Sequence, residues 1–176
     1  MAKATSEDVV LREIRPEDGC SGLSLGDAAF QPLKSFLSGS AKRFQTQNLA
    51  RSYVFATQAD KPSVVAYITL LCSQITIEEN EPAVEDYAYS DLPAVKIARL
   101  AVDRRHRGNQ LGMKLVEFGI AVTRDLVMPH VGCRFIVVDS KQASIGFYRK
   151  MGFVLLDTDA NRGRPNPVMF LDVGKL

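Results

Sequence analysis

The run Val95-Lys96-Ile97-Ala98-Arg99-Leu100-Ala101-Val102, followed by Asp103-Arg104-Arg105-His106-Arg107-Gly108-Asn109-Gln110-Leu111-Gly112, decides the fold expected of this chain. The first eight residues are strongly strand-like, and a polar turn follows them. Apolar residues then recur at helical spacing and predict a long helix that Pro129 ends, with one face formed by Leu111, Leu115, Phe118, Val122 and Leu126. The chain therefore passes from a strand through a glycine-bearing turn directly into a helix.

The flanking segments predict a mixed α/β fold. Further strands are expected at Val9–Ile14, Tyr53–Thr57, Val64–Ile77, Phe135–Val138, Phe153–Leu156 and Val168–Leu171, and further helices at Phe30–Phe44 and Ala143–Met151. The second and third strands in this order form a predicted antiparallel hairpin. We expect a mainly antiparallel sheet with one parallel pair joined by the long helix, in a single domain that covers residues 1–176.

Composition excludes several classes of protein. The 176 residues carry 46% hydrophobic and 24% charged side chains and a net charge of only +2, which is ordinary for a globular domain. The three cysteines are far apart and lack any CxxC pair, so we expect reduced thiols and a cytoplasmic protein. Neither a metal site nor an apolar run long enough for a membrane span is expected.

The turn that opens the long helix is suited to an anion. The first backbone N–H groups of a helix lack intrahelical acceptors and lie at the positive end of the helix dipole. Gly108 and Gly112 allow a ligand to approach the backbone closely, and Arg104, Arg105 and Arg107 add positive charge. Such a turn fits a pyrophosphate, although an ordinary strand-to-helix turn would look the same in sequence.

A second motif follows near the C-terminus. In Phe147-Tyr148-Arg149-Lys150-Met151-Gly152-Phe153, a helix ends at a glycine and leads into a strand. Phe147 and Phe153 fit the core, whereas Tyr148 points about 100° away from Phe147 on the helix. We therefore expect Tyr148 to face a cleft.

With these two motifs in this order and at this separation, the chain resembles the GNAT N-acetyltransferases over residues 95–157. The resemblance implies a GNAT-like mixed, mostly antiparallel central sheet of six to seven strands flanked by helices, with a splayed pair of parallel strands. It also implies an enzyme that transfers an acetyl group from acetyl-CoA to a primary amine by direct attack. One departure concerns Gln110, because family members usually have glycine at that position.

The resemblance also implies the roles of individual residues. Backbone groups of Leu100, Ala101 and Val102 would pair with the pantetheine arm, and Leu100 N–H would stabilise the oxyanion. The pyrophosphate would lie on backbone N–H groups of Arg107, Gly108, Asn109, Gln110, Leu111 and Gly112. Tyr148 would lie near the thioester sulfur and assist the departing thiolate.

The sequence is compatible with more than one acetyl acceptor. Glu85, Asp86 and Asp91 lie in an acidic stretch before the cofactor-binding strand and are candidates for binding a cationic acceptor, such as a polyamine, an aminoglycoside or a lysine-bearing protein. A solvated acidic loop is the simpler interpretation of these residues. A catalytically silent coenzyme A sensor is a further alternative, which Gln110 favours.

The segment from Leu33 to Tyr53 resembles a subgroup of the family, the toxin acetyltransferases of toxin–antitoxin pairs, which acetylate the α-amine of aminoacyl-tRNA. This alternative implies aminoacyl-tRNA and an antitoxin as partners. A phosphate-binding surface would then come from Lys42, Arg43, Arg51, Arg104, Arg105, Arg149, Arg162 and Arg164. The small net charge and the acidic stretch argue against it. Many GNAT enzymes are dimers, so a homodimer is also expected.

Overall fold

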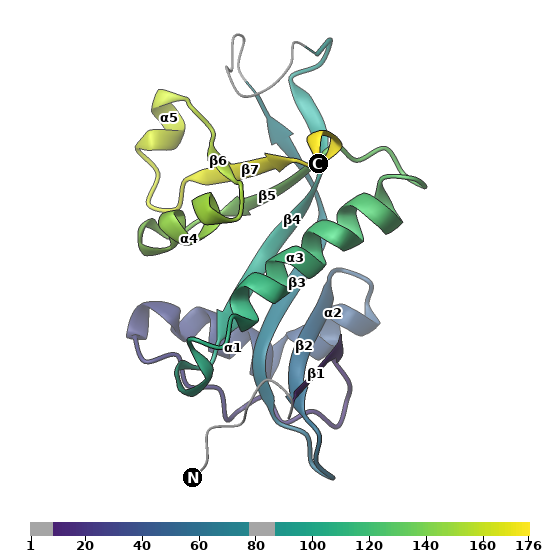
Figure 1. Ribbon diagram of the computed structural model, residues 1–176, viewed down its shortest axis with the longest axis vertical. Helices are drawn as coiled ribbons and strands as arrows, with labels where there is room; N and C mark the ends of the chain where they lie inside the picture. The colour runs from purple at the N-terminus through teal and green to yellow at the C-terminus, as the bar shows by residue number, and fades with distance from the viewer. Residues whose placement is uncertain (1–8, 78–86) are drawn as a thin grey trace. The chain divides into compact units, whose positions relative to one another are not determined.

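The computed structural model describes residues 9–77 and 87–176 (Figure 1). Its strands form a seven-stranded sheet in the order β1-β2-β3-β4-β5-β7-β6. Their bounds are β1 Val9–Glu13, β2 Arg51–Thr57, β3 Val64–Thr76, β4 Asp91–Val102, β5 Phe135–Asp139, β6 Val154–Leu155 and β7 Val168–Asp172. The α-helices are α1 Gln31–Gly39, α2 Ala41–Thr46, α3 Leu111–Ala121, α4 Ile145–Lys150 and α5 Asp159–Arg162.

The sheet confirms the predicted fold class. Antiparallel pairing joins β1 to β2, β2 to β3, β5 to β7 and β6 to β7, and the predicted hairpin is β2–β3. The parallel pair is β4–β5, whose register runs from Ala94↔Phe135 to Ile97↔Val138. The predicted splay of β4 and β5 beyond this register stays a prediction.

The residues group into two compact units, which we describe separately. The first comprises Met1–Leu71 and Arg99–Glu117, and the second comprises Cys72–Ala98 and Phe118–Leu176. The expectation of a single domain stays a prediction.

In the first unit, α1 and α2 pack on the strands through one apolar stripe. Leu37 and Ala41 are buried against Val54, Tyr67 and Ala101. Each large apolar side chain buried in this way contributes about 2 kcal/mol to stability. The Tyr67 hydroxyl donates a hydrogen bond to the Leu33 carbonyl at 2.6 Å and ties α1 to β3.

The predicted helix Phe30–Phe44 is wrong in one respect, because it is two helices. The backbone leaves helical geometry at Ser40, where φ is −129°. Gly39 and Ser40 are poor helix formers, which explains the break at this point. The apolar stripe continues across the break because hydrogen bonds Ser40 N–H to Phe36 O and Phe44 N–H to Ser40 O persist.

In the second unit, one sheet face forms its own core. The buried side chains of this cluster are Ile75, Ile77, Leu92, Ala94, Phe135, Val137, Leu156 and Phe170. The long helix ends in a π-helical turn at Val122–Val127, where Thr123 Oγ1 donates to the Gly119 carbonyl at 2.8 Å. The helix α5 was not predicted, although Thr158 caps it by accepting from Asn161 N–H.

Candidate functional site

The turn after β4 is fixed by a buried carboxylate. The Asp103 side chain has no exposed surface and accepts hydrogen bonds from Ser24 N–H and Arg105 N–H, both at 2.8 Å. The Arg105 guanidinium adds bonds of 2.8 and 2.6 Å. Burial alone raises the pKa of Asp103, but these bonds outweigh it and lower its pKa to about 2. Asp103 is therefore an ionised structural anchor and not a proton acceptor at neutral pH.

Beyond this anchor, the backbone takes left-handed conformations at two positions. Gly108 has φ +89° and Gln110 has φ +59°. The helix α3 begins at Leu111, and Lys114 N–H donates to Gln110 O at 3.0 Å. The amides at the start of the helix, before Lys114, therefore lie at its positive end, as the predicted anion site requires.

The turn leaves open space at Gly108, and its role in binding a pyrophosphate stays a prediction. A Cβ placed on Gly108 would meet no atom within 4 Å, so the backbone there faces open space. Gln110 adopts the conformation that glycine takes most readily, at a strain of about 1 kcal/mol. Its side chain is exposed. The turn therefore keeps the backbone shape of a glycine-containing turn despite the substitution.

The predicted pantetheine contacts lie at the end of β4. Ala101 is buried in the core of the first unit, while Leu100 and Val102 are half-buried. Asp103 N–H, the next amide, donates to Val65 O at 2.8 Å, which fixes the end of β4 against β3. The cofactor-binding role of these backbone groups stays a prediction.

Tyr148 is the buried member of the α4 motif. It is only 5% exposed and makes edge-on ring contacts with Phe147 at 5.1 Å and Phe153 at 5.4 Å. Phe147 is only half-buried. The prediction that Phe147 lies in the core and Tyr148 faces a cleft is therefore wrong in burial, because Tyr148 is the more buried of the two. Gly152, at φ +87°, ends the segment as predicted. Burial raises the pKa of Tyr148 well above its ordinary value.

Of the three acidic residues predicted to bind the acceptor, only Asp91 lies within the described residues. Glu85 and Asp86 lie outside the described residues. Asp91 is exposed, and its Oδ1 accepts a hydrogen bond from Thr76 Oγ1 at 2.6 Å. Its predicted contact with the acceptor stays a prediction.

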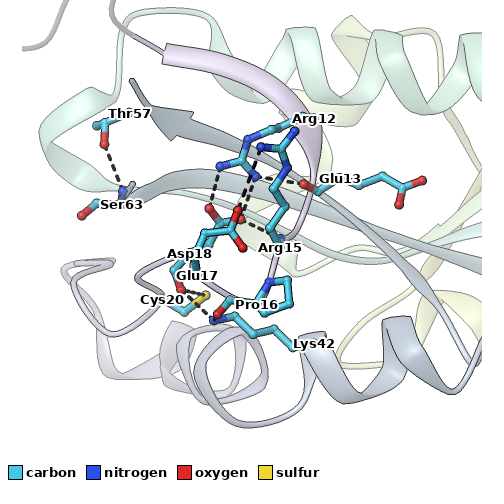
Figure 2. Close-up of polar contacts among 10 residues, drawn as sticks. All are labelled: Arg12, Glu13, Arg15, Pro16, Glu17, Asp18, Cys20, Lys42, Thr57 and Ser63. Atoms are coloured by element: carbon cyan, nitrogen blue, oxygen red, sulfur yellow. Dashed lines mark hydrogen bonds and ion pairs between the residues drawn. The ribbon is translucent and has the colours of Figure 1, made fainter. Parts of the chain in front are cut away.

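Several of the predicted phosphate-binding cations are bonded within the protein, among them Lys42, Arg51, Arg105 and Arg162. Lys42 donates to the carbonyls of Pro16 and Asp18 at 2.6 and 2.7 Å, as Figure 2 shows. Beside it, Arg12 makes a bidentate bond to the buried Asp18 carboxylate (Figure 2). Arg162 forms ion pairs with two aspartates of its own segment, Asp157 and Asp159. The side chains of Arg43, Arg51, Arg104, Arg105, Arg149 and Arg164 are exposed.

The sequence did not single out a pocket in the second unit. It has a volume of about 230 Å³ and contains an ion pair between Lys96 Nζ and Asp139 Oδ2 at 2.6 Å. Asp139 directly follows the apolar run Phe135–Val138, at the carboxyl end of a parallel strand. Ligands in α/β sheets often bind at that position, so the place of Asp139 after an apolar strand could have indicated the pocket from the sequence.

No cluster of three or more His, Cys, Asp or Glu side chains placed to hold a metal occurs within residues 9–77 and 87–176. All three cysteines are free, with Cys20 and Cys133 buried and Cys72 exposed. Over the same ranges, no helix combines the length and hydrophobicity needed to cross a membrane.

Comparisons with known proteins agree with this geometry. The model of the acetyltransferase (GNAT) family matches residues 34–153. No curated protein matches the chain significantly. Among solved structures, a tyrosine-to-phenylalanine mutant of KacT has a TM-score of 0.83 and 20% identity, with 96% of each chain covered. AtaT complexed with acetyl-methionyl-tRNAfMet has a TM-score of 0.81 and 20% identity, again with 96% of each chain covered.

A third structure, AtaTR bound with acetyl-CoA, has a TM-score of 0.75 and 22% identity, and the match covers 96% of both chains. At such identities the likeness shows the fold. It extends over nearly the whole length of both proteins.

Proposed function

The chain belongs to the acetyltransferase (GNAT) family, and from that premise we propose that it acetylates the α-amine of aminoacyl-tRNA. Family membership confirms the predicted class of enzyme, an N-acetyltransferase with acetyl-CoA as donor. The observation that carries the choice of acceptor is the likeness, over 96% of the chain, to AtaT complexed with acetyl-methionyl-tRNAfMet.

The chemistry of the turn supports an acceptor that needs no strong base. An α-amine has a reference pKa of about 7.7–8.0 and is partly neutral at pH 7, whereas a lysine amine at about 10.4 is almost fully protonated. Asp103, the carboxylate next to the turn, has a pKa of about 2 and already accepts four hydrogen bonds. It cannot deprotonate a lysine, but an α-amine does not require it.

The reaction is a direct displacement at the thioester carbonyl. The amine nitrogen forms the new C–N bond, the C–S bond breaks, and the amine proton passes to solvent. Leu100 N–H would hold the developing oxyanion. Much of the rate would come from holding both substrates together.

Tyr148 would serve the departing thiolate as a hydrogen-bond donor. A thiol has a reference pKa of about 8.5, and the pKa of Tyr148 lies above the tyrosine value of about 10. Complete proton transfer from Tyr148 to the thiolate is therefore uphill. The structure gives no support to the lowered pKa that an acid role would need, and we propose the hydrogen-bonding role instead.

The same likeness supports an antitoxin partner. One similar structure holds a tyrosine-to-phenylalanine mutant of the toxin AtaT bound to the C-terminus of the antitoxin AtaR and acetyl-CoA, and another is a KacTA–DNA complex. We propose that this chain also binds a cognate antitoxin. A homodimer and a cytoplasmic location stay predictions.

The decisive experiment supplies the purified protein with labelled acetyl-CoA and a set of aminoacyl-tRNAs, beside lysine peptides and polyamines. We expect label on aminoacyl-tRNA and release of one thiol per acetyl group. Tyr148→Phe should lower kcat about a hundredfold while leaving the acetyl-CoA-induced rise in Tm in place.

Other outcomes would redirect the proposal. Acetylation of lysine peptides or polyamines alone would replace the acceptor with a cationic amine. Binding of acetyl-CoA without any thiol release would identify a sensor. Full turnover by Tyr148→Phe at saturating substrates would remove Tyr148 from the chemistry.

A further inference from the structure

Within the first unit, a loop that precedes α1 is hydrogen-bonded to the turn that follows β4. Ser24 N–H donates to Asp103 Oδ2, and Arg104 N–H donates to Ser24 O, both at 2.8 Å. At the next position of the loop, the Leu25 carbonyl accepts from Arg107 Nη2 at 2.8 Å. Three hydrogen bonds therefore join this loop to the residues that lead into the predicted pyrophosphate turn.

The loop is itself fixed in the fold, so it can hold the turn in place. We call its residues 24–26 the brace. The side chains of Leu23 and Leu25 are buried in the core of the first unit. Further along the chain, the Asp27 side chain caps the short helix that precedes α1. The carbonyl that Arg107 contacts therefore belongs to a residue anchored in the core.

Gly26 brings the brace close to the turn. Its backbone has φ +83°, a conformation that residues with a Cβ rarely adopt. A Cβ at this position would lie 3.4 Å from Arg104 Cδ. The brace and the turn are therefore packed against each other as well as hydrogen-bonded.

Arg107 has a backbone role and a side-chain role in this arrangement. Its backbone begins the predicted pyrophosphate turn, and Gly108 follows it with φ +89°. Its guanidinium donates to the fixed Leu25 carbonyl, which restricts the freedom of the backbone that carries it. A site that is ordered in advance loses less conformational entropy when its ligand binds. The Arg107 side chain can therefore raise cofactor affinity without touching the cofactor.

We propose that Arg107 is a positioning residue for the cofactor: through the Leu25 carbonyl, it holds the turn at Gly108 in its ligand-binding shape before acetyl-CoA arrives. The proposal rests on the proposed function, because it takes acetyl-CoA to bind at this turn, and it deepens that function by naming what orders the site. The brace precedes residues 34–153, the range that the family model matches. Arg107 acts on cofactor binding and leaves the chemical step to other groups.

The first test removes the Arg107 donor. Arg107→Met keeps a long unbranched side chain but cannot donate to the Leu25 carbonyl. We expect the Kd for acetyl-CoA to rise at least about tenfold, while kcat with methionyl-tRNA at saturating acetyl-CoA changes less than about twofold, because the bound cofactor itself completes the ordering. Arg107→Lys, which retains a donor, should recover most of the affinity.

The matched control for this test is Arg15→Met. It removes an arginine side chain that is 59% exposed in the same unit, and it should leave the Kd for acetyl-CoA at the wild-type value. An unchanged Kd in Arg107→Met, or a fall in kcat without a rise in Kd, would overturn the positioning role.

The second test disturbs the brace without removing any charge. Gly26→Ala should shift the brace, because the new Cβ meets Arg104 at a strained backbone angle, and the Kd for acetyl-CoA should rise at least about threefold. The control is Gly39→Ala, whose Cβ would meet no atom within 4 Å. Wild-type affinity in Gly26→Ala would overturn the brace in favour of direct attraction between Arg107 and the pyrophosphate.

Amide hydrogen exchange tests the brace in the protein without cofactor. Arg104 N–H reports on the joint, because it donates to Ser24 O, and its exchange should be at least about fivefold faster in Arg107→Met than in wild type. Val173 N–H, which donates to Arg134 O in the second unit, should exchange at the wild-type rate. An unaltered rate at Arg104 in Arg107→Met would overturn the brace.

These measurements separate the failure of this inference from the failure of the proposed function. If the wild type binds acetyl-CoA but acetylates no aminoacyl-tRNA, the proposed acceptor fails, and a weaker Kd in Arg107→Met would still support the positioning role. If the wild type acetylates aminoacyl-tRNA and Arg107→Met binds acetyl-CoA equally well, only this inference fails. Absence of acetyl-CoA binding by the wild type would overturn both.

Discussion

Two aspartates at the ends of neighbouring parallel strands have opposite environments. Asp103 follows β4, has no exposed side-chain surface and accepts from Ser24 N–H, Arg105 N–H and the Arg105 guanidinium. Asp139 ends β5, is 34% exposed and accepts a bond from Lys96 in a pocket. In sequence both are single aspartates after apolar strands, so burial and hydrogen-bond partners distinguish a buried structural anchor from a partly exposed carboxylate in a pocket.

The difference has a simple physical origin. A fully buried carboxylate is stable only when several donors replace its lost water. Once those donors are in place, it has little capacity left for a substrate. A partly exposed carboxylate in a single ion pair retains that capacity, and the pair contributes little to stability.

The largest expected difference between the two aspartates is the loss of stability that follows their replacement by asparagine. Asp103→Asn should lower the free energy of unfolding by about 3 kcal/mol, because it removes the charge of a fully buried carboxylate that accepts from Ser24 N–H and Arg105. Asp139→Asn should lower it by less than about 1 kcal/mol. Urea denaturation of both variants checks this. Similar losses in the two variants would remove the distinction between a buried anchor and a partly exposed carboxylate.

Lowering the pH of the wild-type protein should also show how much the ionised Asp103 contributes to stability. The pKa of Asp103 is about 2 in the folded protein against 3.8 for the free side chain, so its contribution is present above about pH 4 and is lost as pH falls toward 2. At 1.36 kcal/mol per unit, that loss is about 2 kcal/mol. Asp18, whose pKa is also lowered because hydrogen bonds from Arg12 and Arg15 N–H outweigh its burial, should add to the effect.

The measurement is the free energy of unfolding between pH 6 and 2. The slope should be visibly smaller in Asp103→Asn than in wild type, and Asp139→Asn should retain the wild-type slope. An unchanged slope in Asp103→Asn would contradict the assigned pKa.

Within the turn beyond Asp103, a side chain at Gly108 should strain the backbone. Gly108→Ala places Cβ in open space, so the cost comes from φ +89° alone and should be about 1–2 kcal/mol. Because the turn would shift to relieve this strain, the acetyl-CoA Kd should also rise. Calorimetric titration with acetyl-CoA measures the change, and Gly132→Ala, which also faces open space, is the control. Unaltered binding would argue against a pyrophosphate site at this turn.

The smallest effect is expected at Gln110. Gln110→Gly removes left-handed strain at φ +59° and should raise the free energy of unfolding by about 0.5–1 kcal/mol. The acetyl-CoA Kd should change little, because the backbone already has the shape that glycine would give. Thermal unfolding with and without acetyl-CoA measures both quantities. A large gain in affinity would mean that the Gln110 side chain obstructs the ligand.

Sequence periodicity located the seven strands and the main helices of the described ranges. The alternation in β4 and the helical spacing after Gly108 were clear signals, because both elements contribute apolar side chains to the core, such as Ile97 in β4 and Leu111 and Leu115 in α3. It failed where a single backbone angle decides the outcome, as at Ser40, or where an element is as short as α5. Such short elements are held by local caps, for example Thr158, and bury too few side chains to produce a period.

For the candidate site, the sequence located the turn at Gly108 and the tyrosine on α4, because glycine and the helix start mark them directly. The burial of Tyr148 and the occupation of Lys42 by the Pro16 and Asp18 carbonyls were not predictable. Those outcomes depend on side chains that other segments bring into contact.

The sequence by itself determined the order of elements, the parallel pair and the strand–turn–helix that suits an anion, because these follow from local periodicity and backbone preference. Only the tertiary structure decided which charges are bonded internally and which line a pocket. Asp103 and Asp139 both follow apolar strands, and nothing in that local pattern separates them. They differ in the donors around them, which include Ser24 for Asp103 and Lys96 for Asp139, and the folded chain brings these distant residues together.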